Sequence, residues 1–246
     1  MKMEKQNLFG FSTAPKEPGD FLPIVQYDAR AGRMFRTDKV QTLAGFETKK
    51  ADITGIFKAI FDFENVEVGW CNFTAGQAPD FKMVPIGSQL PAQPSVNHKN
   101  GIRLMIKLSK ECAADTPPVR EISGTAKAMV SGVEAAYAEY LGERDKNPGK
   151  LPVLMLEKAT PVTTGTGDKR STNYHPVFKI VGWAPRGDLV FVGKAGAAAA
   201  TASSAASATS TKGTPPETGS TRAAPPTQQA AQAQLKQMAD VADDFG

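Results

Sequence analysis

The sequence has few of the residues that build metal centres, disulfide frameworks or membrane spans. Its 246 residues include two cysteines and two histidines. Cys71 and Cys112 form no CxxC pair, so we expect neither a disulfide framework nor a zinc site. No run of about 18 apolar residues occurs, which excludes an ordinary membrane-spanning helix. No apolar segment follows the first lysines, so we expect no signal peptide and a cytoplasmic location.

Sequence motifs of common catalytic sites are also missing. The glycine-rich stretch 165–169 lacks the spacing of a phosphate-binding loop, in which Gly-Lys is followed by Ser or Thr. No GxSxG motif is present. Asp62, Glu64 and Glu67 lie close together in sequence, but such groups are more often solvated charges on strands than catalytic sites. We therefore expect no enzymatic activity, no cofactor and no metal site.

The charge balance is compatible with a polyanionic partner. Lys and Arg number 29 and Asp and Glu number 25, which gives a net charge of +4, while the segment after residue 194 is slightly acidic. A basic body attracts polyanions such as nucleic acids. A slightly basic protein without such a partner explains the charge equally well.

Apolar periodicity predicts a mainly β body with one long helix. Residues 120–144 repeat apolar side chains every three or four positions, which predicts an amphipathic helix. Residues 56–64 fit a strand that forms a hairpin with a strand at 66–74. Further strands are predicted at 21–27, 33–41, 81–86, 101–108, 151–158 and 174–184, with a short edge at 189–192. Loops are predicted at 42–52, 89–100 and 160–173.

Composition divides the chain into four parts. Residues 1–20 are expected to form an irregular arm and residues 21–194 the β body. Residues 195–239 are rich in Ala, Ser, Thr, Pro and Gln, a composition that cannot bury enough surface to fold, so we expect a disordered linker. Residues 240–246 place one aromatic side chain among acids at the chain end, as short docking motifs do.

Basic residues are interleaved with aromatic residues in the predicted strands and the loops between them. Single-stranded nucleic acid is bound by cations that neutralise phosphates and by flat rings that stack on bases. A side chain and its neighbour in sequence face opposite sides of a strand, so only part of the set can share one surface. The candidate cations are Arg33, Arg36, Lys82, Lys99, Arg103, Lys107, Lys169, Arg170 and Lys179. The candidate stacking rings are Trp70, Phe73, Phe81, Tyr174 and Phe178, each of which taken alone is more often a core residue.

The layout of the chain resembles a known family. Strands on both sides of a single helix resemble the order of the OB fold, a small β-barrel, with extra strands inserted. Body, linker and acidic tip resemble those of bacterial and phage single-stranded-DNA-binding proteins, and the matching tip residues are Asp240, Asp243, Asp244 and Phe245. The resemblance implies a non-catalytic protein of DNA replication or recombination that binds single-stranded DNA with its barrel and recruits partner proteins with its tip. This tip has fewer acids than the bacterial one and ends in Gly246 instead of Pro-Phe.

Two other classes of protein remain open. A structural or assembly protein of a phage-like particle also combines a β-rich body with an Ala/Thr-rich tail. Such a protein would form large oligomers and show no affinity for nucleic acid. A metal-dependent nuclease that uses Asp62, Glu64 or Glu67 is the second alternative.

Overall fold

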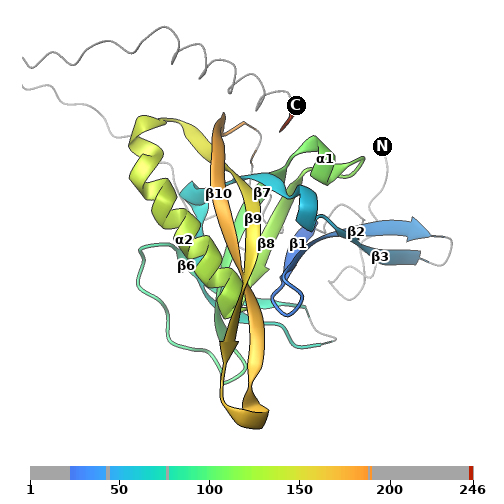
Figure 1. The fold of residues 1–246 in the computed structure, drawn as a ribbon, viewed down its shortest axis with the longest axis vertical. Helices are drawn as coiled ribbons and strands as arrows, with labels where there is room; N and C mark the ends of the chain where they lie inside the picture. The colour runs from blue at the N-terminus through green and yellow to red at the C-terminus, as the bar shows by residue number, and fades with distance from the viewer. Residues whose placement is uncertain (1–22, 43–44, 76–77, 188, 190–243, 246) are drawn as a thin grey trace, which may run out of the picture. The chain divides into compact units, whose positions relative to one another are not determined.

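The computed structural model describes residues 23–42, 45–75, 78–187, 189 and 244–245 (Figure 1). These residues form ten strands and one long helix, which confirms the prediction of a mainly β protein with a single long helix. The predicted arm at 1–20 and the predicted linker at 195–239 lie outside the described residues, as do Asp240 and Asp243.

Most elements follow one another with short connections, and the loop 86–98 between β6 and β7 is the long exception among the described residues. The helices are α1 (Lys110–Ala113) and α2 (Lys127–Glu143), and 3-10 turns occur at η2 (Thr54–Ile56), η3 (Phe63–Asn65), η4 (Arg144–Lys146) and η5 (Gly167–Lys169). In the described part of the chain, neither helix has the length and apolarity needed to cross a membrane. The strands are β1 (Ile24–Asp28), β2 (Arg33–Thr42), β3 (Gly45–Asp52), β4 (Lys58–Phe61), β5 (Glu67–Asn72), β6 (Asp80–Pro85), β7 (Lys99–Leu108), β8 (Val119–Gly124), β9 (Lys150–Thr164) and β10 (Ser171–Pro185).

The strands pair into one mixed sheet that stays open. Its order is β10-β9-β4-β7-β8-β1-β2-β3, and β5 joins β7 while β6 joins β5. Where β10 approaches β1, the Tyr174 amide donates to the Ala29 carbonyl at 2.6 Å, and the Tyr27 hydroxyl donates to the Tyr174 carbonyl at 2.8 Å. These are isolated bonds and not a ladder, so the expected closed barrel is not formed.

The predicted hairpin between residues 56–64 and 66–74 is wrong. β4 pairs with β7 and β9, whereas β5 pairs with β6 and β7. The η3 turn separates the two strands, and Asp62 before this turn accepts hydrogen bonds from Asn65 and Arg186. The consecutive residues Ala59, Ile60 and Phe61 are all buried, which is typical of a central strand covered on both faces.

Two segments that composition predicts to be loops contain strands. β3 pairs with β2 from Gly45 to Asp52, and β9 and β10 form a long hairpin that extends to Thr164 and Ser171 (Figure 1). The outer part of the β9–β10 hairpin is exposed on both faces. Its side chains are therefore polar and rich in Thr, and no apolar alternation marks these residues as strands.

The long helix begins later than the apolar spacing predicts. Residues 120–124 belong to β8, which lies between β7 and β1, and α2 starts at Lys127. Arg120 is fully buried and donates to the Asp38 carboxylate and to the carbonyl of Thr37. Ile122 packs in the core. These long-range pairings hold the segment extended, although its local spacing fits a helix equally well.

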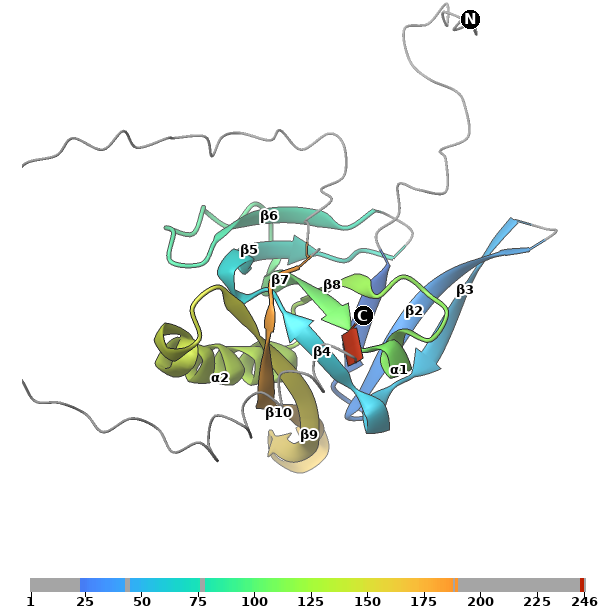
Figure 2. The same cartoon turned by 90° about the horizontal axis from the view of Figure 1, so that it is seen from above.

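The main core lies between the sheet and α2 (Figures 1 and 2). Its aromatic side chains contact one another: the Phe61 ring lies 5.7 Å from that of Phe178 and 5.5 Å from that of Phe63. Gly132 brings α2 close to β10, because a Cβ at this position would lie 2.5 Å from the Pro176 carbonyl oxygen. The contact fixes the helix against one end of the sheet and leaves the opposite sheet face uncovered by α2.

Candidate functional site

The candidate site lies on the sheet face that is turned away from the main core. Along β7, Leu104 and Ile106 pack in the core, whereas Arg103, Met105 and Lys107 alternate with them and point to the other side. We call this second surface the outer face. The strand registers place side chains of β4, β5, β6, β9 and β10 on it beside those of β7.

Arg103 and two aromatic rings form the first part of the outer face. The registers bring Glu67 of β5 opposite Arg103, and Cys71 opposite Phe81 of β6. The guanidinium carbon of Arg103 lies 5.1 Å from the centroid of the Phe81 ring. The Phe73 ring meets Phe81 edge-on at 5.7 Å and is 48% exposed. An exposed ring thus lies next to a cation that is stacked on a second ring.

Two carboxylates hold Arg103 in this position. Arg103 Nε donates to Glu121 Oε2 at 2.8 Å, and its Nη1 lies 3.7 Å from Glu67 Oε2. Burial raises the pKa of Glu67, and this Oε2 atom has no hydrogen-bond partner among the described residues. Burial also raises the pKa of the nearby Cys71 thiol to about 11, so this thiol is protonated at neutral pH and is not a nucleophile.

Three lysines form the second part of the outer face. Met155 of β9 stands opposite both Lys58 of β4 and Lys179 of β10, so the two lysines flank its exposed side chain. Lys107 of β7 stands opposite Ile60 in the next row. Lys179 is exposed, and Lys58 and Lys107 are half-buried. Lysines whose stems lie on a sheet and whose amines reach water suit contacts with phosphates.

The end of the chain occupies this same lysine row. Figure 2 shows the short red segment, residues 244–245, beside β4. Asp244 Oδ2 lies 2.6 Å from Lys58 Nζ. Phe245 is 8% exposed. Its buried neighbours on the outer face are Ile60, Leu151, Val153, Ala184 and Leu189. The last acid and the last aromatic residue of the chain therefore contact the body of the protein itself.

A separate cleft of about 460 Å³ lies where β5 and β7 meet the start of α2. We call it the Trp70 cleft. Trp70 lines it, and the indole Nε1–H donates to the Pro91 carbonyl at 2.8 Å. Lys99 at the start of β7 and Lys127 at the start of α2 line the same cleft. Lys127 thus lies beside an aromatic ring, and the register places Lys99 opposite Cys71, at the border between this cleft and the outer face.

The remaining predicted cations lie away from the outer face. Arg36 donates to Asp38 and to the carbonyls of Cys112 and Ala113, so its guanidinium is bonded within the fold. Its role is structural, which corrects its prediction as a binding cation. The others are on the surface: Arg33 is paired with Asp52, Lys82 lies 3.4 Å from Asp80, and Lys169 and Arg170 are exposed at the end of the β9–β10 hairpin.

One predicted stacking ring belongs to the core. Phe178 is 6% exposed and contacts Phe57 and Phe61, so its prediction as a stacking ring is wrong. The reason is strand alternation: Lys179 takes the outer face, and Phe178 must then face the core. Tyr174 is half-buried where β10 approaches β1, and its backbone makes the contact between these strands.

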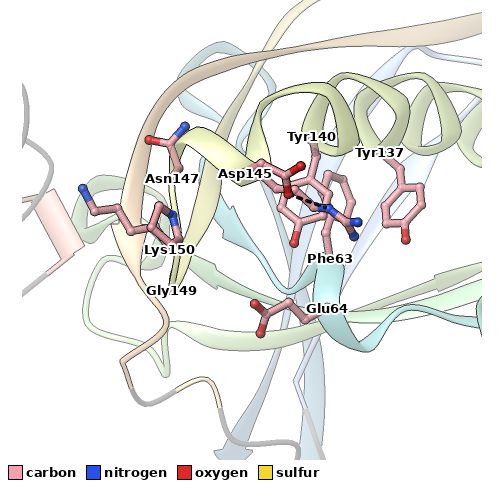
Figure 3. A pocket seen from close by; sticks show the side chains of 10 residues that line it. Phe63, Glu64, Tyr137, Tyr140, Asp145, Asn147, Gly149 and Lys150 are labelled. Carbon is pink, nitrogen blue, oxygen red and sulfur yellow. Dashed lines mark ion pairs between the residues drawn. The ribbon is translucent and has the colours of Figure 1, made fainter. Parts of the chain in front are cut away.

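A second open cleft, of about 490 Å³, lies at the C-terminal end of α2 (Figure 3). Tyr137 and Tyr140 line it, but each ring packs 5.4 Å from the ring of Phe63 and so belongs to the edge of the core. Glu64 and Asp145 add carboxylates to its walls. Arg144 and Lys150 line it as well, so its charges balance and it lacks the excess of cations that a polyanion requires.

The three carboxylates considered for a nuclease do not converge. Asp62 and Glu64 both pair with Arg186, whereas Glu67 faces Arg103 on β5. Within the ranges that the structure describes, no group of three or more His, Cys, Asp and Glu side chains could hold a metal ion. Asp62 and Glu64 instead anchor the η3 turn to the end of β10.

Sequence reasoning did not identify Lys58, Lys127 or the apolar residues on which Phe245 packs. Alternation along β4 shows that Lys58 points away from the core, but only the pairing of β4 with β9 places it in a row with Lys179. The helical pattern places Lys127 toward water without indicating that it lies beside Trp70. No local signal in the sequence links Phe245 to β4.

Comparison with known proteins finds no protein-family model, no curated protein and no solved structure that matches this chain.

Proposed function

We propose that this chain is a non-catalytic single-stranded-DNA-binding protein that acts in phage-like DNA replication or recombination. One observation carries the proposal. Arg103 stacks on Phe81 beside the exposed Phe73 ring, and Lys107 and Lys179 lie on the same sheet face. Binding of single strands without sequence preference needs this combination of cations for phosphates and flat rings for bases on one surface.

The exposed rings favour single strands over duplex. The faces of bases in a duplex are covered by neighbouring base pairs, whereas an unpaired base can stack on Phe73 or Phe81. Lys107 and Lys179 provide only charge and attract either form of DNA. The preference for single strands is therefore expected to depend on the rings, and the overall affinity on the lysines.

The tip has a place in the same proposal. Docked on the body, Asp244 neutralises Lys58 and Phe245 covers apolar residues of the outer face. DNA on this face and the docked tip compete for the same lysine. We propose that a tip displaced by DNA binds replication or recombination proteins, which recognise its acids and its aromatic ring.

Fluorescence anisotropy with labelled oligonucleotides tests the proposal. At low salt we expect the intact chain to bind oligo(dT) more tightly than a duplex of equal length. Phe73→Ala should weaken oligo(dT) binding by about 5- to 100-fold, the effect of losing one stacked base, with little change for duplex. Val96→Ala is the matched control, because Val96 is 91% exposed and lies in the loop before β7.

Salt dependence tests the lysines separately. Lys107→Gln and Lys179→Gln should each lower the slope of log K against log salt by about one, because each removes one phosphate contact. Lys146→Gln, at an exposed lysine after α2, should leave the slope unchanged. Equal affinity of the intact chain for single strands and duplex would overturn the proposal. Large ordered oligomers without affinity for DNA would instead indicate an assembly protein, and metal-dependent cleavage of the oligonucleotide would indicate a nuclease.

A further inference from the structure

We infer that the Trp70 cleft is a nucleotide subsite, which holds one base of a single strand against the Trp70 indole and the adjoining phosphate at Lys127, while Lys99 borders the cleft from the outer face. The inference rests on the proposed function and adds a second binding site to the outer face. Its location differs, since Trp70 lies on the opposite side of β5 from the residues that pair with Arg103 and Phe81.

The Trp70 indole is held in place by a hydrogen bond to the loop that contains Pro91. Its Nε1–H, the only polar group of the ring, donates to the Pro91 carbonyl, so the flat faces of the ring are what it offers a ligand. The loop that carries Pro91 is fixed at its end by His98, which is 6% exposed. His98 Nδ1 lies 2.8 Å from Ser95 Oγ, and His98 Nε2 lies 3.1 Å from Asp80 Oδ2. A ring that is already ordered costs little entropy when a base stacks on it.

The cleft has the size and the polarity that a nucleotide requires. Its volume of about 460 Å³ lies within the range of small-molecule sites. Val130 adds an apolar side chain to the wall, and Asn100 adds an amide that can bond to the edge of a base. Gln93 adds a second amide. A stacking surface and amides, which both donate and accept hydrogen bonds, suit any base, in keeping with binding that does not depend on sequence.

Charge determines which ligand of this size the cleft takes. Lys127 is exposed and lines the cleft from the start of α2, and the exposed Lys99 borders it at the start of β7, with its side chain on the face of Arg103. Glu134 is the one carboxylate among the residues that line it, so positive charge prevails. A neutral aromatic ligand would use the indole but not the lysines, whereas a base that carries a phosphate uses both.

β7 connects this cleft with the outer face. Lys99 begins the strand, and Arg103 lies four residues further along it, a separation of about 13 Å at the usual strand rise. A single strand that follows β7 can therefore place one nucleotide in the cleft and further nucleotides on the outer face.

Tryptophan fluorescence of the full chain tests the inference. The chain has two tryptophans, and Trp183 packs 5.9 Å from Tyr140, away from the Trp70 cleft. In the Trp183→Phe chain, Trp70 is the only reporter, and oligo(dT) should quench its emission at the concentrations at which a labelled oligonucleotide binds. In the Trp70→Phe chain the remaining tryptophan should show no quenching.

Affinity measurements on the same full-length chains complete the test. Trp70→Ala should weaken oligo(dT) binding by about 5- to 100-fold, whereas Trp70→Phe, which keeps a flat ring, should retain most of the affinity. Lys127→Gln should lower the salt slope by about one, and Lys146→Gln at the other end of α2 should not.

The outcomes separate this inference from the proposed function. Binding of oligo(dT) that leaves Trp70 emission unchanged, with an unaltered affinity of Trp70→Ala, overturns the nucleotide subsite and leaves the outer face as the binding site. Failure of the intact chain to bind oligo(dT) at low salt overturns both. Quenching by oligo(dT) that persists after Phe73→Ala supports a subsite that acts separately from the outer face.

Discussion

Removal of the Phe245 ring is expected to strengthen the binding of single-stranded DNA. Phe245 packs on Ile60 and Val153 of the outer face, and Asp244 pairs with Lys58. Under the proposed function, DNA would use this part of the face only when the tip has left it. The apparent affinity for DNA is therefore reduced by the fraction of molecules in which the tip is docked.

The size of this effect follows from the contacts of the tip. Burial of a phenylalanine side chain contributes about 1.5–3 kcal/mol. A partly exposed ion pair such as that of Asp244 with Lys58 contributes at most about 1 kcal/mol. Ordering the backbone costs about 1–2 kcal/mol for each residue, or about 2–4 kcal/mol for two, so the sum ranges from about 2.5 kcal/mol against docking to about 2 kcal/mol in its favour. A tip that is docked in at least half of the molecules corresponds to the part of this range between zero and about 2 kcal/mol. Phe245→Ala should thus tighten oligo(dT) binding by about two- to thirtyfold.

Anisotropy titrations of the intact chain, Phe245→Ala and Phe245→Leu at one low salt concentration measure this effect. Leu retains most of the apolar contact, so Phe245→Leu should bind DNA with nearly the affinity of the intact chain. The chain cut after Lys194 should bind at least as tightly as the intact one. If Phe245→Ala binds no more tightly than the intact chain, the docked tip does not cover the DNA site and the reasoning is refuted.

Three predictions concern stability, each measured as the free energy of unfolding in denaturant. Gly132→Ala should lower the free energy of unfolding by about 1–3 kcal/mol, because the added Cβ would collide with β10. Gly142→Ala is the control on the same helix: no atom lies within 4 Å of the added Cβ, so this change should stabilise the fold by about 0.5–1 kcal/mol. Burial raises the pKa of Glu67, so the folded chain keeps this proton to higher pH than the unfolded chain. The free energy of unfolding therefore falls as the pH rises from the Glu67 pKa of the unfolded chain to that of the folded chain. Glu67→Gln should make this fall smaller and raise the free energy of unfolding at neutral pH. Asp38→Ala leaves the fully buried Arg120 without its carboxylate and should cost about 3–5 kcal/mol; a loss below 1 kcal/mol would contradict this.

Alternation of side chains made the half-buried strands predictable from the sequence. β7 keeps Ile102, Leu104 and Ile106 in the core and turns Arg103 and Lys107 outward, as its pattern indicates. β3 and the outer half of the β9–β10 hairpin carry no such pattern, because their exposed faces need no apolar side chains. The start of β8 has apolar spacing that also fits a helix. Its buried residues contact partners far away in the sequence, and local spacing does not reveal these contacts.

The sequence was enough to predict most residues of the candidate site, but not how they are arranged in space. Composition identifies Arg103, Phe81 and Lys107 as basic or aromatic residues in strands, and alternation separates Phe178 from Lys179. The pairing of β5 with both β6 and β7 is what brings Phe81 under Arg103. Such a pairing joins segments whose order in the sheet differs from their order in the chain, and local patterns contain no information about it.

Burial on both faces of the sheet explains why the chain end docks where it does. Ala59, Ile60 and Phe61 of β4 are consecutive buried residues, and Leu151 and Val153 of β9 are buried on the side opposite Leu154. A strand that is apolar on both sides needs a cover on its second side. The main core supplies the first cover, and Phe245, together with Leu189, supplies the second. A bound single strand, whose bases are flat and largely apolar, can cover the same residues while its phosphates replace Asp244 at Lys58. The proposed competition between the tip and DNA for one surface thus follows from two requirements of the outer face that each would satisfy, apolar contact and negative charge.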